Sequence, residues 1–214
     1  YNVSPFICKV IGKANVTVTD VTFENMNAKT ITGGDVAPIA GCVEGNLTLI
    51  KVAVRNSTAI GHRNVSAVIG SVSVGGKLTI EGTLTIENVN VLTIGGRSAL
   101  ICKVSNTNQL SIASNADISI KNSSVGIYNN PESKQEVLGA VPSSVDEGTK
   151  EVYEFKNQKS VIMSIKNFNN GGEPQYSYYG YHSGAIVAFL SGDKEKNSFY
   201  TSVDDVKSVF EAQK

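Results

Sequence analysis

Hydrophobic and polar residues alternate along most of this chain, and the alternation recurs with a period of about 30 residues. Each repeat holds three short segments in a fixed order. The first segment has a small residue in its third place, next to apolar residues. Its members are Phe6–Val10, Ile39–Val43, Val68–Val72, Leu100–Val104, Val137–Val141 and Ile186–Leu190. Self-similarity at this period is typical of a repeat architecture, in which each unit packs on its neighbours.

The other two segments place apolar residues two apart, which indicates half-buried strands. The second segment alternates around a polar residue, in Val16–Val18, Leu47–Leu49, Leu78–Ile80, Leu110–Ile112 and Tyr153–Phe155. The third segment ends on an asparagine, in Val21–Asn25, Val52–Asn56, Leu84–Asn88, Ile118–Asn122 and Met163–Asn167. Asparagine and glycine at the segment ends mark bends. Each repeat is therefore predicted to form short strands separated by turns.

This pattern predicts an all-β fold, a right-handed parallel β-helix (solenoid) of about five to six coils. Equivalent strands of successive coils would pair in register about 4.8 Å apart, and their inward side chains would stack into one core. A β-sandwich of short antiparallel strands also explains the alternation. It does not explain a small residue and an asparagine at fixed offsets, so the solenoid is preferred.

Two columns of polar residues are expected to run along the solenoid. The asparagines that end the third segment can hydrogen-bond from coil to coil, as side-chain amides do in stacked strands. The residue before each asparagine alternates in charge over the first four repeats: Glu24, Arg55, Glu87 and Lys121, followed by Lys166. A cross-strand charge ladder of this kind favours the register and the solubility of the stack.

The coils are expected to widen toward the C-terminus. The offset between the second and third segments is five residues in the first two repeats, then six, eight and ten. Residues inserted into a solenoid form loops on its rim, often on the side that binds a partner. Functional residues are therefore expected in the later coils.

The end of the chain changes character. Ser202–Asp205 resembles a helix start, with acidic residues in the first turn. One apolar stripe follows, formed by Val203, Val206, Val209 and Phe210. We expect residues 1–192 to form the parallel β-helix and residues 193–214 to form a capping segment. Its helix, at about 202–213, would cover the open edge of the last coil.

Composition limits the functional classes. The chain has 214 residues and a formal net charge of zero, and no basic patch points to nucleic acid. It has no initiating Met, no signal peptide and no apolar run of transmembrane length, so we expect a trimmed part of a larger chain without membrane insertion. Asn, Thr, Ser and Gly are abundant while charge is modest, as is common in extracellular β proteins. The expected location is extracellular or at the cell surface.

The three cysteines do not predict a disulfide. Cys8 and Cys102 share one column but lie three rungs apart, about 14 Å, which is beyond bridging reach. Cys42 is one place further along its coil, so its side chain is expected to face the other way from Cys8. We therefore expect buried free thiols. Because no Cys or His pair has ligand spacing, no metal site and no cofactor is predicted.

A polysaccharide-active enzyme is the main alternative function, because β-solenoids host polysaccharide lyases and hydrolases. Such an enzyme needs carboxylates gathered on one face, as an acid and a base or around calcium. The acidic residues outside the charge ladder occupy non-equivalent places: Asp20, Asp35, Glu44, Glu81 and Asp117. The two histidines, His62 and His182, lie in coils well apart. No catalytic residue is therefore assigned.

Tyrosines concentrate in one late segment, Tyr176–His182, which follows Asn169–Gly172. Half of the eight tyrosines fall in these seven residues. Flat amphipathic rings suit stacking on sugars or contact with a protein partner. The candidate ligand-binding residues are Tyr176, Tyr178, Tyr179, Tyr181 and His182. The alternative is that the rings pack the last coil against the C-terminal helix.

The unit Val65–Ile80 and its continuation Ile86–Val89 resemble the Gly-rich, GLUG-type repeats of bacterial surface proteins. Those repeats have a Gly-Gly-Leu-Val-Gly-like core followed by an Ile-x-Asn segment. The resemblance extends over roughly residues 5–125 and 184–192, with Cys or Ala in place of the glycine in three first segments. The leading glycine pair is present only at Gly33–Gly34 and Gly95–Gly96. The resemblance implies a secreted or surface-anchored, adhesin-like protein, and it implies no catalytic residues.

These observations together predict a non-catalytic module for adhesion or for binding a glycan or a host cell-surface protein. A polysaccharide lyase or hydrolase, with a substrate cleft in the widened coils, is the main alternative. A structural spacer of a larger surface protein is the third.

Overall fold

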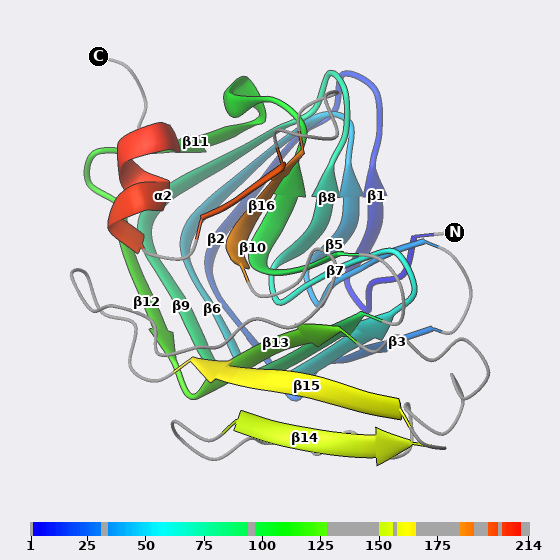
Figure 1. The fold of residues 1–214 in the computed structure, drawn as a ribbon. Coiled ribbons are helices and arrows are strands. Elements are labelled where there is room, and N and C mark those ends of the chain that lie inside the picture. The colour runs from blue at the N-terminus through cyan, green and yellow to red at the C-terminus, as the bar shows by residue number, and fades with distance from the viewer. Residues whose placement is uncertain are drawn as a thin grey trace.

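The computed structural model describes residues 2–30, 34–93, 97–127, 150–155, 158–165, 185–190, 197–200 and 203–210. These residues form an all-β solenoid of parallel stacked strands with one short C-terminal helix, which confirms the predicted fold class (Figure 1). The parallel part makes about three turns. The repeat predicts five to six coils, and the difference arises in the chain that follows residue 127.

Two sheets enclose the core. The short-strand sheet consists of β1 Ile7–Val10, β4 Asp35–Val36, β5 Ala40–Val43, β7 Asn64–Ser66, β8 Ile69–Val72, β10 Arg97–Val104, β16 Ala185–Leu190 and β17 Asn197–Tyr200. The long-strand sheet consists of β2 Asn15–Glu24, β3 Asn27–Lys29, β6 Asn46–Gly61, β9 Lys77–Thr93, β11 Leu110–Ile112, β12 Asp117–Lys121, β13 Ser123–Ile127, β14 Lys150–Phe155 and β15 Gln158–Ile165. A 3-10 helix, η1 Thr107–Gln109, precedes β11, and helix α2 Val203–Phe210 follows β17.

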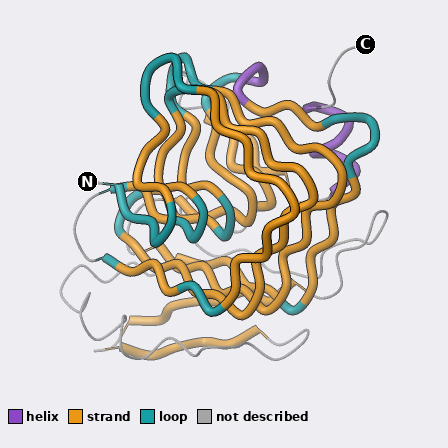
Figure 2. The backbone as a smooth tube through the Cα atoms, turned by 180° about the vertical axis from the view of Figure 1, so that it is seen from behind, coloured by secondary structure: helices purple, strands orange, loops and turns teal. Residues whose placement is uncertain are grey.

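Equivalent strands of the first four repeats pair in parallel, and their register is the predicted one. In the second segment, Thr48 of β6 pairs with Thr17 of β2 and with Thr79 of β9. In the first segment, Ile7 of β1 pairs with Ala40 of β5, which places Cys8 level with Gly41. In Figure 2 the backbone tube winds through successive coils, and their strands run side by side. The repeat therefore defines both the strands and their partners.

Inward side chains of the four repeats form one continuous core. Leu47, Leu78 and Leu110 pair in register and are at most 2% exposed. Leu78 is stacked between Leu47 and Leu110, so each of its faces meets the equivalent side chain of a neighbouring coil. A single coil cannot bury its own apolar face, so stacking is the source of the core.

Four asparagines bend the chain at the end of each third segment. They have backbone φ angles of 56° at Asn25, 47° at Asn56, 53° at Asn88 and 46° at Asn122. Asparagine tolerates this left-handed region better than most residues do. The Asn88 amide donates a 3.0 Å hydrogen bond to Asn56 Oδ1, which confirms the amide ladder at this step. The Asn56 amide donates instead to Glu24 Oε1, at 3.0 Å, so the ladder passes to a carboxylate in the first coil.

The charge ladder also has the predicted register. Glu87 pairs with Arg55 on one side and with Lys121 on the other. Arg55 Nε lies 3.3 Å from Glu87 Oε2, and these side chains are 45% and 34% exposed. Solvent screens a pair this exposed, so its contribution to stability is at most about 1 kcal/mol. The ladder thus avoids like-charge contacts more than it adds stability.

The small residue in the first segment is required by a close approach of backbones. A Cβ at Gly70 would lie 2.5 Å from the Gly41 carbonyl oxygen and 2.8 Å from the Val36 nitrogen. A Cβ at Gly41 would lie 2.9 Å from the Asp35 carbonyl oxygen. Distances under 3.0 Å are essentially never seen for a real Cβ. Strand β4 therefore packs directly against β5 and β8, and it leaves no room for a side chain there.

In the long-strand sheet the parallel stack ends at β13, where the sequence predicts a fifth coil, whereas in the short-strand sheet β16 continues it in parallel beside β10. β15 pairs antiparallel with β13, with Met163 opposite Val125, and β14 pairs antiparallel with β15. Tyr153–Phe155 and Met163–Ile165 therefore form a hairpin, and the prediction that they stack as parallel rungs is wrong. Alternation with period two is the same for either strand direction, so the pattern alone does not distinguish the two arrangements.

Strand β16 takes the next place beside β10. The predicted rung Val137–Val141 lies outside the described residues, and β16 pairs with β10 directly. Cys102 pairs with Val187, whereas the repeat predicts Ala188. An irregularity between Ala99 and Cys102 accounts for this one-residue shift, as a β-bulge does when it inserts a residue into one strand. β17 then pairs antiparallel with β16.

The C-terminal helix lies within the predicted range and is shorter, Val203–Phe210. Val206 and Phe210 are four residues apart on one face and are 0% and 2% exposed. Val209 is 38% exposed, so it does not belong to the buried stripe as predicted. The helix packs against η1, β11, β16 and β17 (Figure 1). It therefore covers the fourth coil beside β11, where its two buried side chains join the common core.

Asn88→Ala is expected to lower the free energy of unfolding by about 2 kcal/mol, because alanine is strained at a φ of 53° and also loses the amide hydrogen bond to Asn56. Asn88→Gly is the matched control, since glycine adopts this backbone freely and loses only the hydrogen bond, at a cost of about 1 kcal/mol or less. Urea denaturation followed by circular dichroism measures both losses. Equal losses in the two variants would contradict the role given to the left-handed bend.

Candidate functional site

The residues that the sequence singles out for ligand binding lie outside the described part of the chain. They are Tyr176, Tyr178, Tyr179, Tyr181 and His182. Their role stays a prediction. The described coils contain a different candidate, a group of polar and charged side chains on the short-strand sheet.

Asp35 is a buried carboxylate at the centre of this group. It lies in the two-residue strand β4 and is 5% exposed. In the coils that the structure describes, it is the one acidic residue among the buried polar side chains. A carboxylate in such a place is unfavourable unless donors or cations surround it. Its neighbours therefore decide what the site can do.

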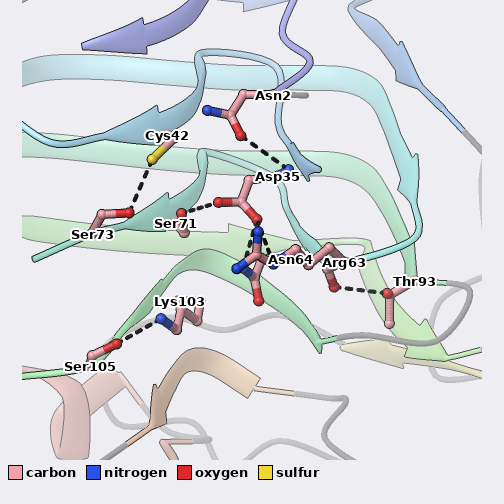
Figure 3. Close-up of polar contacts among 10 residues, drawn as sticks. All are labelled: Asn2, Asp35, Cys42, Arg63, Asn64, Ser71, Ser73, Thr93, Lys103 and Ser105. Carbon is pink, nitrogen blue, oxygen red and sulfur yellow. Dashed lines mark hydrogen bonds and ion pairs between the residues drawn. The ribbon is translucent and has the colours of Figure 1, made fainter. Parts of the chain in front are cut away.

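Three donors from the next coil surround the Asp35 carboxylate (Figure 3). Asn64 Nδ2 in β7 donates to Oδ1 at 2.7 Å, and Ser71 Oγ in β8 donates to Oδ2. Arg63 Nε lies 3.9 Å from Oδ1. The backbone N–H of Asp35 donates to Asn2 Oδ1 at 3.4 Å. The chain bends between β7 and β8, so side chains from both strands reach one carboxylate.

The fourth coil adds two cations beside these donors. In the strand register, Arg97 of β10 pairs with Asn64, and Lys103 of β10 pairs with Ser71. Adjacent rungs are about 4.8 Å apart. The carboxylate is thus separated from Arg97 and Lys103 by one layer of neutral donors. We call these six residues the Asp35 cluster: Asp35, Arg63, Asn64, Ser71, Arg97 and Lys103.

The cations of the cluster lie near enough to act on one another. Burial lowers the pKa of Lys103 below its ordinary value of 10.5, and the positive charge of Arg97 lowers it further. The negative charge of Asp35 raises the pKa of Lys103, and the positive charge of Arg63 lowers it. Burial also lowers the pKa of Arg97, and Arg63 adds to that effect while Asp35 opposes it. Three cations therefore share the field of a single carboxylate, and their mutual repulsion is only partly offset.

A second lysine in the same column shows what Lys103 lacks. Lys9 pairs with Cys42 in the strand register, which places it in line with Ser71 and Lys103. Lys9 Nζ lies 2.6 Å from Glu44 Oε1, and this hydrogen bond raises the pKa of Lys9. Glu44 directly follows β5, and the residue that directly follows β10 is Ser105. Lys103 Nζ donates to that hydroxyl at 2.7 Å, so a neutral group stands where the second coil has a carboxylate.

Several polar atoms in and beside the cluster are buried without a hydrogen-bond partner in the described chain. They are Arg97 Nε, Asn64 Oδ1, Ser66 Oγ and Ser98 Oγ. Ser98 directly follows Arg97 in β10, and Ser66 lies two residues after Asn64 in β7. Within the described coils, Arg97 and Lys103 also form no ion pair with a carboxylate. A buried donor or acceptor that stays unpaired costs about 1–3 kcal/mol. The cluster therefore retains hydrogen-bonding capacity that coil packing does not use.

The cysteines form no disulfide in the described chain. All three are free, as predicted, and Cys42 and Cys102 are buried. Cys8 is exposed, which corrects the prediction that all three thiols are buried. It lies on β1, which is the end strand of its sheet and pairs with β5 alone. Burial raises the pKa of the Cys102 thiol. In the described coils, no three His, Cys, Asp or Glu side chains come together as metal ligands would.

Comparison with protein-family models, curated proteins and solved structures yields no match. In the part of the chain that the structure describes, no helix has the length and apolar character needed to cross a membrane. Among the described residues, the Asp35 cluster is the group whose chemistry suggests a function.

Sequence reasoning missed the Asp35 cluster, although a signal was present. Asp35, Asn64 and Arg97 each lie three or four residues before a first segment, and they pair in the strand register. The repeat analysis groups residues by similarity, and this column changes from carboxylate to amide to guanidinium. A search for polar residues at one offset, whatever their charge, would have found it.

Asp35→Ala is expected to lower the free energy of unfolding by about 3 kcal/mol, because it leaves the Asn64 and Ser71 donors unpaired and removes the counter-charge of the cluster. Asp35→Asn is the matched control: it has the same shape and can keep a bond to each donor residue. We expect it to recover more than half of the loss. Urea denaturation at pH 7 measures both. An Ala variant as stable as the parent would show that the carboxylate does not hold the coils together.

Ellman's reagent is expected to modify one thiol per folded chain rapidly, because Cys8 is exposed while Cys42 and Cys102 are buried. The other two should react only after denaturation. Cys8→Ser is the control and should abolish the rapid phase. Rapid modification of two or three thiols in the native protein would contradict the burial of Cys42 and Cys102.

Proposed function

We propose that this chain is a non-catalytic solenoid module that binds a glycan or a protein at a cell surface. The Asp35 cluster carries the proposal, because it sets three cations against one carboxylate and holds buried polar atoms that have no partner in the described chain. The cluster is built on β4, β7, β8 and β10, which are strands of one sheet. Binding sites on such paired strands are held in a fixed geometry.

The repeating columns do not supply a competing site. The small residues of the first segment permit a close backbone approach, and the asparagines make the bends. The alternating charges of the third segment compensate one another. Each of these columns is thus explained by the stacking of the coils. The Asp35 cluster is the described group for which stacking gives no sufficient reason.

Binding is favoured over hydrolysis by the number of carboxylates. A glycosidase of the common type needs two carboxyl groups about 5–10 Å apart, one as an acid and one as a base or nucleophile. The Asp35 cluster contains one carboxylate, and Asn64 and Ser71 already donate to its two oxygens. A carboxylate held in this way is poorly placed to exchange a proton with a substrate.

The proposed location is extracellular or at the cell surface. The resemblance of Val65–Ile80 to the repeats of bacterial surface proteins supports it, as does a composition rich in Asn, Thr, Ser and Gly. The partner is then a glycan or a surface protein of another cell. In this setting the solenoid both holds the site and acts as a spacer.

A glycan array probed with the labelled protein tests the proposal, and we expect binding to a limited set of glycans. Lys77→Gln is the control variant, since it removes an exposed charge outside the Asp35 cluster, and it should bind as the parent does. The double variant Arg63→Gln/Lys103→Gln should lose most of the glycan-binding signal.

The double variant Tyr178→Ala/Tyr181→Ala tests the tyrosine-rich segment separately, and unchanged binding would remove these tyrosines from the proposal. Absence of binding by the parent protein, on glycans and on cell-surface extracts alike, would leave only the role of a spacer.

A further inference from the structure

We propose that Arg63, Arg97 and Lys103 form a subsite for an oxyanion, the carboxylate or sulfate group of an acidic sugar. The anion site follows from the cluster itself, and only the sugar that carries the anion rests on the proposed function. The ligand is thereby narrowed from glycans in general to acidic ones.

The charge balance of the cluster favours an anionic ligand. Three cations face one carboxylate, in a chain whose formal net charge is zero. Asn64 and Ser71 are neutral donors that each hold one Asp35 oxygen, so a single negative charge stands against the three cations. Arg63 lies 3.9 Å from it, beyond the length of a good hydrogen bond. An anion bound among the cations would remove the repulsion that burial makes unfavourable.

The cations also supply hydrogen-bond donors that suit an oxyanion. A guanidinium carries five N–H donors in a planar fork, and an ammonium carries three. Lys103 uses one donor on Ser105 Oγ, at 2.7 Å. The Nε of Arg97 is buried and has no partner in the described chain. Charge-assisted hydrogen bonds to carboxylate or sulfate oxygens are the strongest that such donors make, and the fork matches the spacing of two oxygens.

Exposure differs between the cations and the carboxylate. The Arg63 side chain is 67% exposed, whereas the Asp35 side chain is 7% exposed. Lys103 and Arg97 are half-buried. Arg63 is therefore the most exposed of the three cations, and a ligand would meet it before it meets Asp35. This order favours an anion and disfavours a cation, whose approach the outer positive charges would oppose.

The size of the site favours a single acidic group over a long polyanion. Nucleic acids are bound by stripes of many cations that follow the phosphates. The cluster offers three cations, which suits one or two acidic groups on a short sugar. An acidic peptide presents the same carboxylate on another scaffold, and it is treated below as an outcome of the experiment.

If these residues served only to hold the coils together, their variants would behave differently. Arg97 pairs with Asn64 in the strand register, and Arg97 Nε and Asn64 Oδ1 are a donor and an acceptor that both lack partners. A small rotation that joined them would make Arg97 a link between coils. In that case Arg97→Gln would change stability, while Arg63→Gln and Lys103→Gln would have no effect on any ligand.

The experiment is a titration of the full chain, labelled with 15N, with glucuronate, glucose 6-sulfate, inorganic sulfate and neutral glucose. The arginine Nε–Hε and backbone signals are followed by NMR. We expect both acidic sugars and sulfate to shift the signals of Arg63, Arg97 and Lys103, and glucose to leave them in place.

Arg63→Gln and Lys103→Gln should each lower the affinity for the acidic sugars about tenfold. Lys77→Gln, with the same change in net charge, should not. Raising the salt concentration should weaken binding, because these cations are partly exposed.

Three results would overturn the proposal. They are equal binding of glucose and glucuronate, no shift at the three cations with any anion, and the same weakening by Lys77→Gln as by Lys103→Gln. Because Arg63 is largely exposed, Arg63→Gln keeps the test valid even where Arg97→Gln fails to fold. A glutamate-rich peptide that binds more tightly than the sugars would confirm the anion site and reject the sugar.

The two proposals fail in different ways. If the parent protein binds neutral glycans on the array but no anion in the titration, the module function stands and the oxyanion site is wrong. If anions bind at the three cations but no glycan is retained on the array, the site stands and the glycan-binding function is wrong.

Discussion

Parallel in-register pairing between coils is the constraint on which the rest of this molecule depends. At about 4.8 Å per rung, every residue lies directly on the equivalent residue of its neighbours. A residue type is therefore acceptable only if it can be stacked on itself or on a complement. Leu47, Leu78 and Leu110 meet this condition by apolar contact. Glu87 meets it between Arg55 and Lys121 by opposite charge.

The same constraint explains which positions vary little and which vary freely. The third place of the first segment is small because the backbone of β4 leaves no space for a side chain at Gly41 and Gly70. The end of the third segment is asparagine because the chain bends there through the left-handed region in every coil. The column of Asp35, Asn64 and Arg97 lies at a bend of the short-strand sheet, and no such rule acts on it. Its residue types change from coil to coil, as a site shaped by a ligand rather than by stacking would.

Predictability from the sequence follows this division. The strands, their register over four repeats, the asparagine bends and the helix near Val203–Phe210 all come from local periodicity, which a single sequence displays. The antiparallel direction of β14 and β15 does not come from local periodicity, because alternation with period two is the same for a parallel and an antiparallel strand. The Asp35 cluster does not come from local periodicity either, because its other members lie 28 to 68 residues from Asp35 in the chain and include amide, hydroxyl, guanidinium and ammonium groups. Proximity of this kind is a property of the register and becomes visible only once the coils are stacked.

The cost of the Asp35 cluster is the strongest reason to regard it as functional. The stack could place an apolar residue at position 35, as it does at Val36, and avoid a buried carboxylate with its two donors. It could also place a carboxylate after β10, as it places Glu44 after β5, and neutralise Lys103. The chain does neither. It buries a negative charge that fixes Asn64 and Ser71, and it sets Arg97 and Lys103 on the next coil, where neither forms an ion pair with a carboxylate of the described residues. Departures from the local rule that stacking requires are expected where a surface is kept for a partner.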